Sequence, residues 1–349
     1  MKKVLIFCLF VPFVMYAQII GNCDAPYNEA SVLTSIFINN LSATNVTISG
    51  SECSSGYFDG TNSNIGLSSG FVMATGGLES ISPGGFSGTT GGAGEDADLS
   101  LQLEMVNAMN SNLNNLTVLE FDFVADTNFI SFQYVFASNE YPSFTCSQYN
   151  DIFGFFISGP GISGPFTNNA ENIAIVPDPN NPGFYTTTPV IINSVNSGIS
   201  SSGNDSLCDD IDPNWQDYSV YFVDNSSAET VSFPGFTTPL IAQSAVVLGE
   251  TYHVKLAIAD VADGGLNSAV FFQQKSFGAI FGCTDPTACN YNSLADFDDG
   301  SCQGFISNTA AFLSTFANEF NVVEYSNSPT DTYTFFEEGD VDFTDSTSV

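Results

Sequence analysis

Short runs that alternate apolar and polar residues recur along most of the chain, separated by clusters of Gly, Ser, Asn and Pro. This pattern is typical of β-strands joined by turns, and it predicts an all-β fold, a jelly-roll-like sandwich of two sheets with long loops. The predicted strands are Thr117–Val124, Phe129–Ala137, Asp151–Ser158, Asn172–Val176, Pro189–Asn193, Ser219–Val223, Thr251–Ala259 and Ser268–Gln273.

The stretch from Phe132 to Pro160 is the centre of this prediction. Two apolar strand-like runs flank a polar loop that carries Glu140, Cys146, Asn150 and Asp151. One interpretation is a hairpin with a solvated loop. The other is a rigid pair of strands with a binding site at its rim. The sequence leaves both open.

One short helix is predicted, within Asp96–Asn114. Apolar residues recur there at helical spacing, and Asp96 is placed to cap the first turn. The residues of the apolar stripe are Leu99, Leu103, Val106, Met109 and Leu113. We expect this helix to pack across one end of the sandwich.

Changes in local amino-acid composition along the chain predict four regions. Residues 1–17 have the charged start, apolar core and small-residue end of a signal peptide, whose apolar run is too short for a membrane span. Residues 18–281 form the sandwich, and residues 282–303 form a small acidic, Cys-rich module with little to bury. Residues 304–349 read as a linker and the start of a further, Ig-like domain. Because the last strand-like run meets the end of the chain, we expect this sequence to be the N-terminal piece of a longer protein.

The cysteines favour an exported, oxidised protein. The chain has eight, of which Cys8 lies in the predicted signal peptide. Proximity within each region suggests the pairs Cys23–Cys53, Cys146–Cys208 and Cys283–Cys302, which leaves Cys289 over, although spacing alone does not fix connectivity. The last pair would pin the acidic module.

Charge narrows the range of partners. The chain has a net charge of −34, and removal of Lys2 and Lys3 with the signal peptide would make it more negative still, since only Lys255 and Lys275 would remain basic. Nucleic-acid binding needs Lys and Arg to neutralise phosphates, so it is excluded. No later run is long and apolar enough for membrane insertion. Divalent cations are the natural counter-ions.

Two polar loops together predict a calcium site. One carries Glu140, Asn150 and Asp151, and the other, just after the strand at 251–259, carries Asp260, Asp263 and Asn267. Calcium takes six to eight oxygens from carboxylates, amides and carbonyls, which these residues supply. If both loops lie at the same edge of the sandwich, they form one site. The alternative is two solvated turns, since Asp-Gly-Gly is itself a good hairpin turn.

Catalytic motifs are weak by comparison, so we expect a protein that is not an enzyme. The single histidine, His253, lies within a predicted strand without a nucleophile elbow or a zinc-ligand set around it. Among 38 acidic residues a glycosidase pair is always conceivable, but no spacing singles one out.

Several ordered blocks resemble a known family. FASNEYPSFTCSQYNDIFGFFISGPGI, NIAIVP, PVIINSVN and TYHVKLAIADVADGGLNSAVF are similar to the choice-of-anchor L domain of secreted bacterial surface proteins, over about residues 28–278. GCTDPTACNYNSLADFDDGSC resembles an acidic Cys repeat of large surface proteins from gliding bacteria with type IX secretion. EEGDVDFTDSTSV resembles the opening strands of a PKD-type Ig-like domain. These resemblances imply a modular extracellular protein and carry no catalytic residues.

The combined expectation is the N-terminal part of a secreted, calcium-stabilised cell-surface adhesin or binding protein. Its partner would be a carbohydrate or another surface protein. Two alternatives stay open: a secreted polysaccharide hydrolase with a carboxylate pair near Glu140 and Asp151, and a structural subunit of a surface filament.

Overall fold

The computed structural model describes residues 20–82, 94–181, 183–227 and 230–303, and the backbone of three strands within 320–345. The predicted signal peptide therefore lies outside the described residues. The chain divides into two compact units, Met1–Gly278 and Ala279–Val349. Each unit is described by itself.

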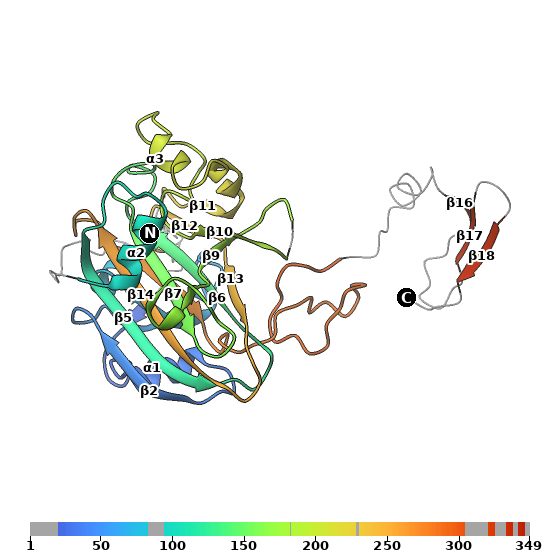
Figure 1. Cartoon of the computed structure of the whole chain (residues 1–349), viewed down its shortest axis with the longest axis horizontal. Coiled ribbons are helices and arrows are strands. Elements are labelled where there is room, and N and C mark those ends of the chain that lie inside the picture. Colours follow the sequence, from blue (N-terminus) through green and yellow to red (C-terminus); the bar gives the residue numbers. More distant parts are fainter. Residues whose placement is uncertain are drawn as a thin grey trace, which may run out of the picture. The chain divides into compact units, whose positions relative to one another are not determined.

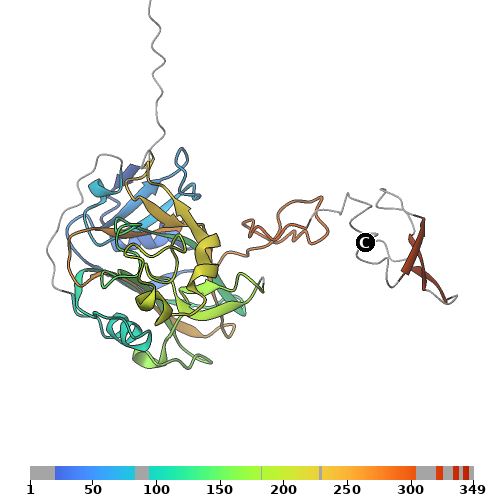
Figure 2. The same cartoon turned by 90° about the horizontal axis from the view of Figure 1, so that it is seen from above.

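The first unit contains two main antiparallel sheets (Figures 1 and 2). The larger follows the order β1-β3-β4-β15-β6-β12-β11, with β13 also paired to β6. Its strands are β1 Ile20–Asn22, β3 Ser55–Asp59, β4 Ser69–Ala74, β6 Phe129–Ser138, β11 Phe222–Asp224, β12 Gly235–Thr237, β13 Leu240–Ala245 and β15 Ser268–Gln273.

The second sheet has the order β2-β5-β14-β7-β8. Its strands are β2 Ala43–Ser49, β5 Leu113–Val124, β7 Ile152–Ser158, β8 Glu171–Asn172 and β14 Thr251–Val261. A separate pair joins β9 Ile175–Pro177 to β10 Tyr185–Pro189. The helices are α1 Ala30–Phe37, α2 Ala97–Met105 and α3 Ser206–Asp209, and 3₁₀ turns occupy Leu78–Ser80, Thr167–Asn169 and Trp215–Tyr221.

The core lies between the two sheets and is strongly aromatic. Phe132 of the larger sheet packs on Phe155 of the smaller one, with ring centroids 4.4 Å apart. Tyr134 and Phe153 make a second contact of this kind at 5.6 Å. Alternate residues of each strand supply these rings, so the period-2 pattern builds the sandwich as predicted.

The outer faces of both sheets are also covered. Leu99 and Leu103 of α2 pack with Phe156 and Ala257 over the five-stranded sheet, where Figure 1 shows α2 crossing β7 and β14. Loop residues such as Ile65 and Phe233 cover Phe271 on the other sheet. This double burial explains why β7 and β15 read as nearly continuous apolar runs rather than alternating ones.

The predicted helix is right at its start and too long at its end. Asp96 is the N-cap and accepts hydrogen bonds from the amides of Asp98 and Leu99. However, α2 ends at Met105, and Asn107 has a left-handed backbone with φ 52°. Leu113 belongs to β5, and Met109 is 66% exposed. Asparagine favours turns over helix, so the helix ends at the Asn-rich segment although the apolar residues continue at helical spacing.

Three other predictions of secondary structure need correction. Pro189–Asn193 is not a strand, because β10 ends at Pro189 and a turn follows. Ser219–Val223 is mostly a 3₁₀ turn, and Asn172–Val176 is divided between β8 and β9. These short segments owe their conformation to packing rather than to local pattern, since Val190 and Ile192 are buried without being in a sheet.

The hairpin interpretation of Phe132–Pro160 is wrong. The strand β6 lies in the eight-stranded sheet and β7 in the five-stranded sheet. The loop between them crosses from one sheet to the other instead of turning back along its own sheet. This crossing carries Glu140 and Asp151 into the interior, where both are buried.

All three expected disulfides are formed: Cys23–Cys53, Cys146–Cys208 and Cys283–Cys302. Cys289 is a free, exposed thiol. In the second unit, the last disulfide closes a small acidic loop. The backbone farther on forms a three-stranded sheet of β16 Phe320–Glu324, β17 Tyr333–Glu337 and β18 Val341–Asp345.

We expect loss of the Cys146–Cys208 disulfide to destabilise the first unit. It closes a loop across a sequence separation of 62 residues. The chain-entropy model for such a loop gives a loss of about 4 kcal/mol. The double variant Cys146→Ser/Cys208→Ser, measured by urea unfolding, tests this. Cys289→Ser is the control and should leave the midpoint unchanged; equal midpoints for all three proteins would contradict the prediction.

Candidate metal centre

Four strand ends meet at one end of the sandwich and bring the two predicted loops together. Val261 at the end of β14 donates its amide to Asp151 Oδ1 at 3.0 Å, and Ser268 at the start of β15 donates its hydroxyl to Asp151 Oδ2 at 2.6 Å. The amide of Asn139 donates to the carbonyl of Asn267 at 3.0 Å. Asp151 therefore links the two sheets, and the loops share one edge, as the calcium hypothesis requires.

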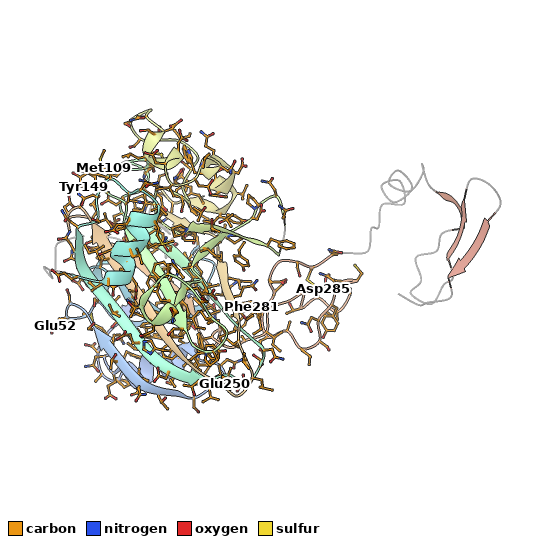
Figure 3. All side chains as sticks on the ribbon, viewed as in Figure 1. Glu52, Met109, Tyr149, Glu250, Phe281 and Asp285 are labelled. Carbon is orange, nitrogen blue, oxygen red and sulfur yellow. A yellow bond between two sulfur atoms is a disulfide. The ribbon has the colours of Figure 1, made fainter. Side chains whose placement is uncertain are left out.

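Most of the predicted ligands are buried, which the solvated-turn interpretation did not foresee. Asp263 alone stays on the surface. The buried members are Glu140 at 3% exposure, Asn150 at 2%, and Asp151, Asp260 and Asn267 at 1% each. We call Glu140, Asp151 and Asp260 the carboxyl cluster. Figure 3 labels two chain neighbours of these loops. Tyr149, next to Asn150, lies toward one end of the first unit, and Glu250, just before β14, lies toward the opposite end.

Neighbouring amides orient part of the site. Asn115 Nδ2 donates to Asp260 Oδ2 at 2.7 Å, and the amide of Asn193 donates to Asn150 Oδ1 at 2.9 Å. Asn115 takes a left-handed backbone, φ 50°, within β5. The sequence analysis missed both Asn115 and Asn193. No local signal could have found them, because Asn115 and Asp260 are 145 positions apart.

Within the described part of the chain, the site contains buried polar atoms without a hydrogen-bond partner. Among the described residues, Glu140 Oε2 accepts no hydrogen bond and Asn150 Nδ2 has no acceptor. A buried polar atom without a partner costs about 1–3 kcal/mol, and a charged one costs more. Such atoms call for a ligand, an ordered water or a proton.

Burial and mutual repulsion disfavour ionisation of the cluster. Burial, and then the charges of Asp151 and Asp263, raise the pKa of Glu140 to about 9. Burial raises the pKa of Asp151 to about 7, although hydrogen bonds from Ser268 and Val261 oppose the shift. Burial and the charge of Asp151 raise the pKa of Asp260 well above its usual range. At neutral pH the cluster therefore needs protons or a cation.

The described protein offers no cation to the cluster. Lys255 binds Asp96 and Asp98, with Nζ 2.9 Å and 2.5 Å from their carboxylate oxygens. Lys275 donates to the carbonyls of Ser35 and Ile38. No other Lys or Arg occurs after residue 3. The compensating charge must therefore come from bound protons or from a metal ion.

The donor set fits a hard, oxygen-seeking ion. Among the described residues, no three His, Cys, Asp or Glu side chains are arranged to hold one metal ion. An ion here would thus take two carboxylates at most and complete its shell with amide, carbonyl and water oxygens. Calcium accepts such mixed shells, whereas zinc prefers nitrogen and sulfur.

The lone histidine does not make a catalytic triad, although its strand neighbours suggest one. Asp122 and Ser158 lie opposite His253 on the two adjacent strands. His253 Nδ1 is 2.7 Å from Asp122 Oδ1, but Nε2 faces Glu120 at 3.6 Å. The ring is thus held between two carboxylates, and its second nitrogen is directed to an acid instead of a nucleophile.

The geometry defines a class of protein: a disulfide-linked, acidic two-sheet sandwich with its polar site at the strand ends. The chain belongs to the choice-of-anchor L domain family, whose model matches residues 22–278. That family consists of surface-associated domains and is not a known enzyme family, so membership implies an extracellular protein of the bacterial surface. No curated protein and no solved structure matches the chain. No helix in the described ranges is long and apolar enough to cross a bilayer.

Proposed function

We propose that this chain belongs to a modular cell-surface adhesin or binding protein whose choice-of-anchor L domain is stabilised by calcium. The domain would bind a carbohydrate or another surface protein. The acidic Cys module and an Ig-like domain would act as a stalk, and export by the type IX route would deliver the protein to the surface. Calcium would bind between the loops after β6 and β14.

The carboxyl cluster is the observation that supports the calcium part. Among the described residues it holds three nearly fully buried acids, a carboxylate oxygen of Glu140 without a donor, and no basic residue. A divalent ion would neutralise two negative charges at once and would coordinate the carboxylate oxygen that has no hydrogen-bond donor. Because the loops join both sheets, an ion there would also stiffen the sandwich.

The same burial weighs against the hydrolase alternative. A glycosidase needs both carboxyls open to a sugar. Glu140 and Asp151 are only 3% and 1% exposed, so a polymer cannot reach them without opening the fold. The filament alternative would use a free sheet edge. The exposed edge strand β2 is bulged between Thr44 and Thr47, which hinders pairing with another chain.

Calcium titration of metal-free protein tests the proposal. Extracellular modules bind calcium with Kd values on the order of 10⁻⁴–10⁻³ M, so 10 mM calcium should stabilise the domain by about 1.4 to 2.7 kcal/mol. We expect binding heat and a melting temperature raised by several degrees. Asp151→Ala and Asp260→Asn should abolish both responses.

The control is Asp126→Asn, the same loss of charge on an exposed loop residue. It should keep the full calcium response. Absence of heat and of any thermal shift in the wild-type protein would remove calcium from the proposal. An equal response in Asp260→Asn and in the wild type would move the ion away from the cluster.

A further inference from the structure

Lys255 lies between two carboxylates in a buried site on the outer face of the five-stranded sheet, where α2 covers β14 and β7 (Figure 1). Its Nζ is 2.5 Å from Asp98 Oδ2 and 2.9 Å from Asp96 Oδ2. The side chains are only 13%, 5% and 10% exposed for Lys255, Asp98 and Asp96. The ring of Phe156 lies with its centroid 5.0 Å from Nζ. An amine and a carboxyl group are therefore in contact in a site that is nearly closed to water.

The two oxygens of Asp98 have different environments. Oδ1 accepts two hydrogen bonds from Thr167, at 2.8 Å from its amide and 2.7 Å from its hydroxyl. Oδ2 contacts the amine of Lys255 instead. Two donors on one oxygen stabilise the negative charge that this oxygen gains when a nucleophile adds to the carboxyl carbon, as in an oxyanion hole. Oδ1 is thus placed as the oxygen that stays, and Oδ2 as the oxygen that leaves.

Asp96 is held where it can accept protons from the amine. Both of its oxygens lie within 3.0 Å of Lys255 Nζ, which is the distance that a general base requires. Its Oδ1 also accepts the backbone amides of Asp98 and Leu99 at the start of α2, so the carboxylate is fixed in orientation. Transfer of a proton from Nζ to Asp96 frees the lone pair that a lysine needs to act as a nucleophile.

A small cavity adjoins the reacting groups. It has a volume of about 80 Å³, and its lining includes Asp98, Thr167, Lys255 and the half-buried His253. This volume is ample for one water molecule. Water released by a condensation at Asp98 therefore has a place to go beside the site.

We propose that Lys255 and Asp98 join to form an intramolecular amide crosslink between β14 and α2, with Asp96 as the base. Nζ attacks the carboxyl carbon of Asp98, a carbon–nitrogen bond forms, and the bond from that carbon to Oδ2 breaks. Asp96 takes protons from Nζ and delivers them to Oδ2, which leaves as water. One ammonium and one carboxylate supply every atom of the amide and the water, so no co-reactant is needed. The ion pair in the structure is the reactant of this step.

The crosslink fastens the first turn of α2 to a central strand of the five-stranded sheet. Lys255 and Asp96 are 159 positions apart in the chain, and the segment between them includes every strand from β5 to β13. A pull on the two ends of the chain then bypasses this segment, because the force passes through the amide bond. This property is independent of calcium and of any bound partner, and so goes beyond the proposed function.

Trypsin reports the crosslink directly, because the chain offers it few sites. After residue 3, Lys255 and Lys275 are the only lysines, and arginine is absent. Trypsin needs a positive charge at the cleaved residue, so it does not cut after a lysine whose amine is acylated. Wild-type protein, reduced and unfolded, should be cut after Lys275 alone and should show a mass deficit of about 18 Da, one water.

Lys255→Arg separates the ion pair from the covalent bond. Arginine keeps the positive charge and the trypsin site, but its guanidinium stays protonated and does not attack a carboxyl group. This variant should be cut at both positions and show the full mass. Asp98→Ala, which lacks the carboxyl carbon that is attacked, should give the same result. Lys275→Arg is the matched control and should show the wild-type cleavage pattern and mass deficit.

Asp96→Asn tests the base. Asparagine still caps α2 but takes no proton, so crosslink formation, followed by mass after cell-free synthesis, should slow by about a hundredfold or more. Three results would overturn the assignment: cleavage of the wild type after Lys255 with the full mass, a mass deficit that peptide sequencing places on other residues, or the same deficit in Lys255→Arg. An unchanged rate in Asp96→Asn would overturn the role of Asp96.

Discussion

Without divalent cations, the free energy of unfolding of the choice-of-anchor L domain is expected to fall as the pH rises from 5 to 9. Glu140, Asp151 and Asp260 all have a folded-state pKa above the unfolded value, with about 9 for Glu140 and about 7 for Asp151. The folded protein therefore binds more protons than the unfolded chain over this window. The stabilisation is full below the unfolded pKa values of about 4 and falls as the pH rises toward each folded-state pKa, with a slope of up to roughly 1.4 kcal/mol per pH unit for each group.

Calcium should oppose this loss, because the ion replaces the protons. Urea midpoints measured from pH 5 to 9 in EDTA and in 10 mM calcium would show two curves that separate above about pH 6. Asp260→Asn should flatten the EDTA curve and remove the calcium effect, so that it is more stable than the wild type at pH 8 in EDTA. Asp126→Asn should follow the wild type. A pH-independent midpoint in EDTA would refute the proton-binding role of the cluster.

The second large effect is expected from Lys255→Met. Lys255 reaches Asp96 and Asp98 from β14 and lies 5.0 Å from the ring centroid of Phe156. Its ammonium group holds the first turn of α2 against the sheet. Asp98 is only 3% exposed and also accepts bonds from the amide and hydroxyl of Thr167. Removal of the cation leaves this buried carboxylate uncompensated, at a cost of about 3–5 kcal/mol.

A double-mutant cycle measures this coupling. Lys255→Met/Asp98→Asn should recover part of the loss, because the buried negative charge is gone with its partner. Lys275→Met is the matched control, since Lys275 is exposed and only donates to two carbonyls. Its effect on the urea midpoint should stay within about 1 kcal/mol. Equal losses of unfolding free energy in the two lysine variants would mean that the ion pair of Lys255 with Asp96 and Asp98 does not stabilise the domain.

The long strands could be predicted from the sequence because their pattern is local. Ser268–Gln273 is a strand with the predicted bounds, and the runs before Val124, after Phe129 and after Thr251 lie in β5, β6 and β14. The disulfide pairs also followed from proximity. One failure was local: α2 ends before Asn107, whose left-handed backbone outweighed the helical spacing of the apolar residues. The other was governed by distant contacts, which place β6 and β7 in different sheets.

The candidate site was predicted in composition but not in environment. The sequence analysis placed Asp151 and Asp260 in one site on the assumption that their two loops lie at the same edge of the sandwich. The hydrogen bond from the Val261 amide to Asp151 shows that the loops do lie at the same edge. Their depth of burial could not be foreseen. It depends on the crossing of the β6–β7 loop between sheets and on Asn115, a residue of another strand.

The strand order also governs when this domain can fold during export. The middle of each sheet is made late: β14 pairs with β5 and β7, and β15 pairs with β4 and β6. When only residues 1–250 have emerged, both sheets lack their central strands, β14 and β15, and only the strands on either side of them are present. High contact order of this kind slows folding. Translocation should therefore proceed on an uncompacted polypeptide, and tertiary structure should arise only after almost the whole domain has emerged.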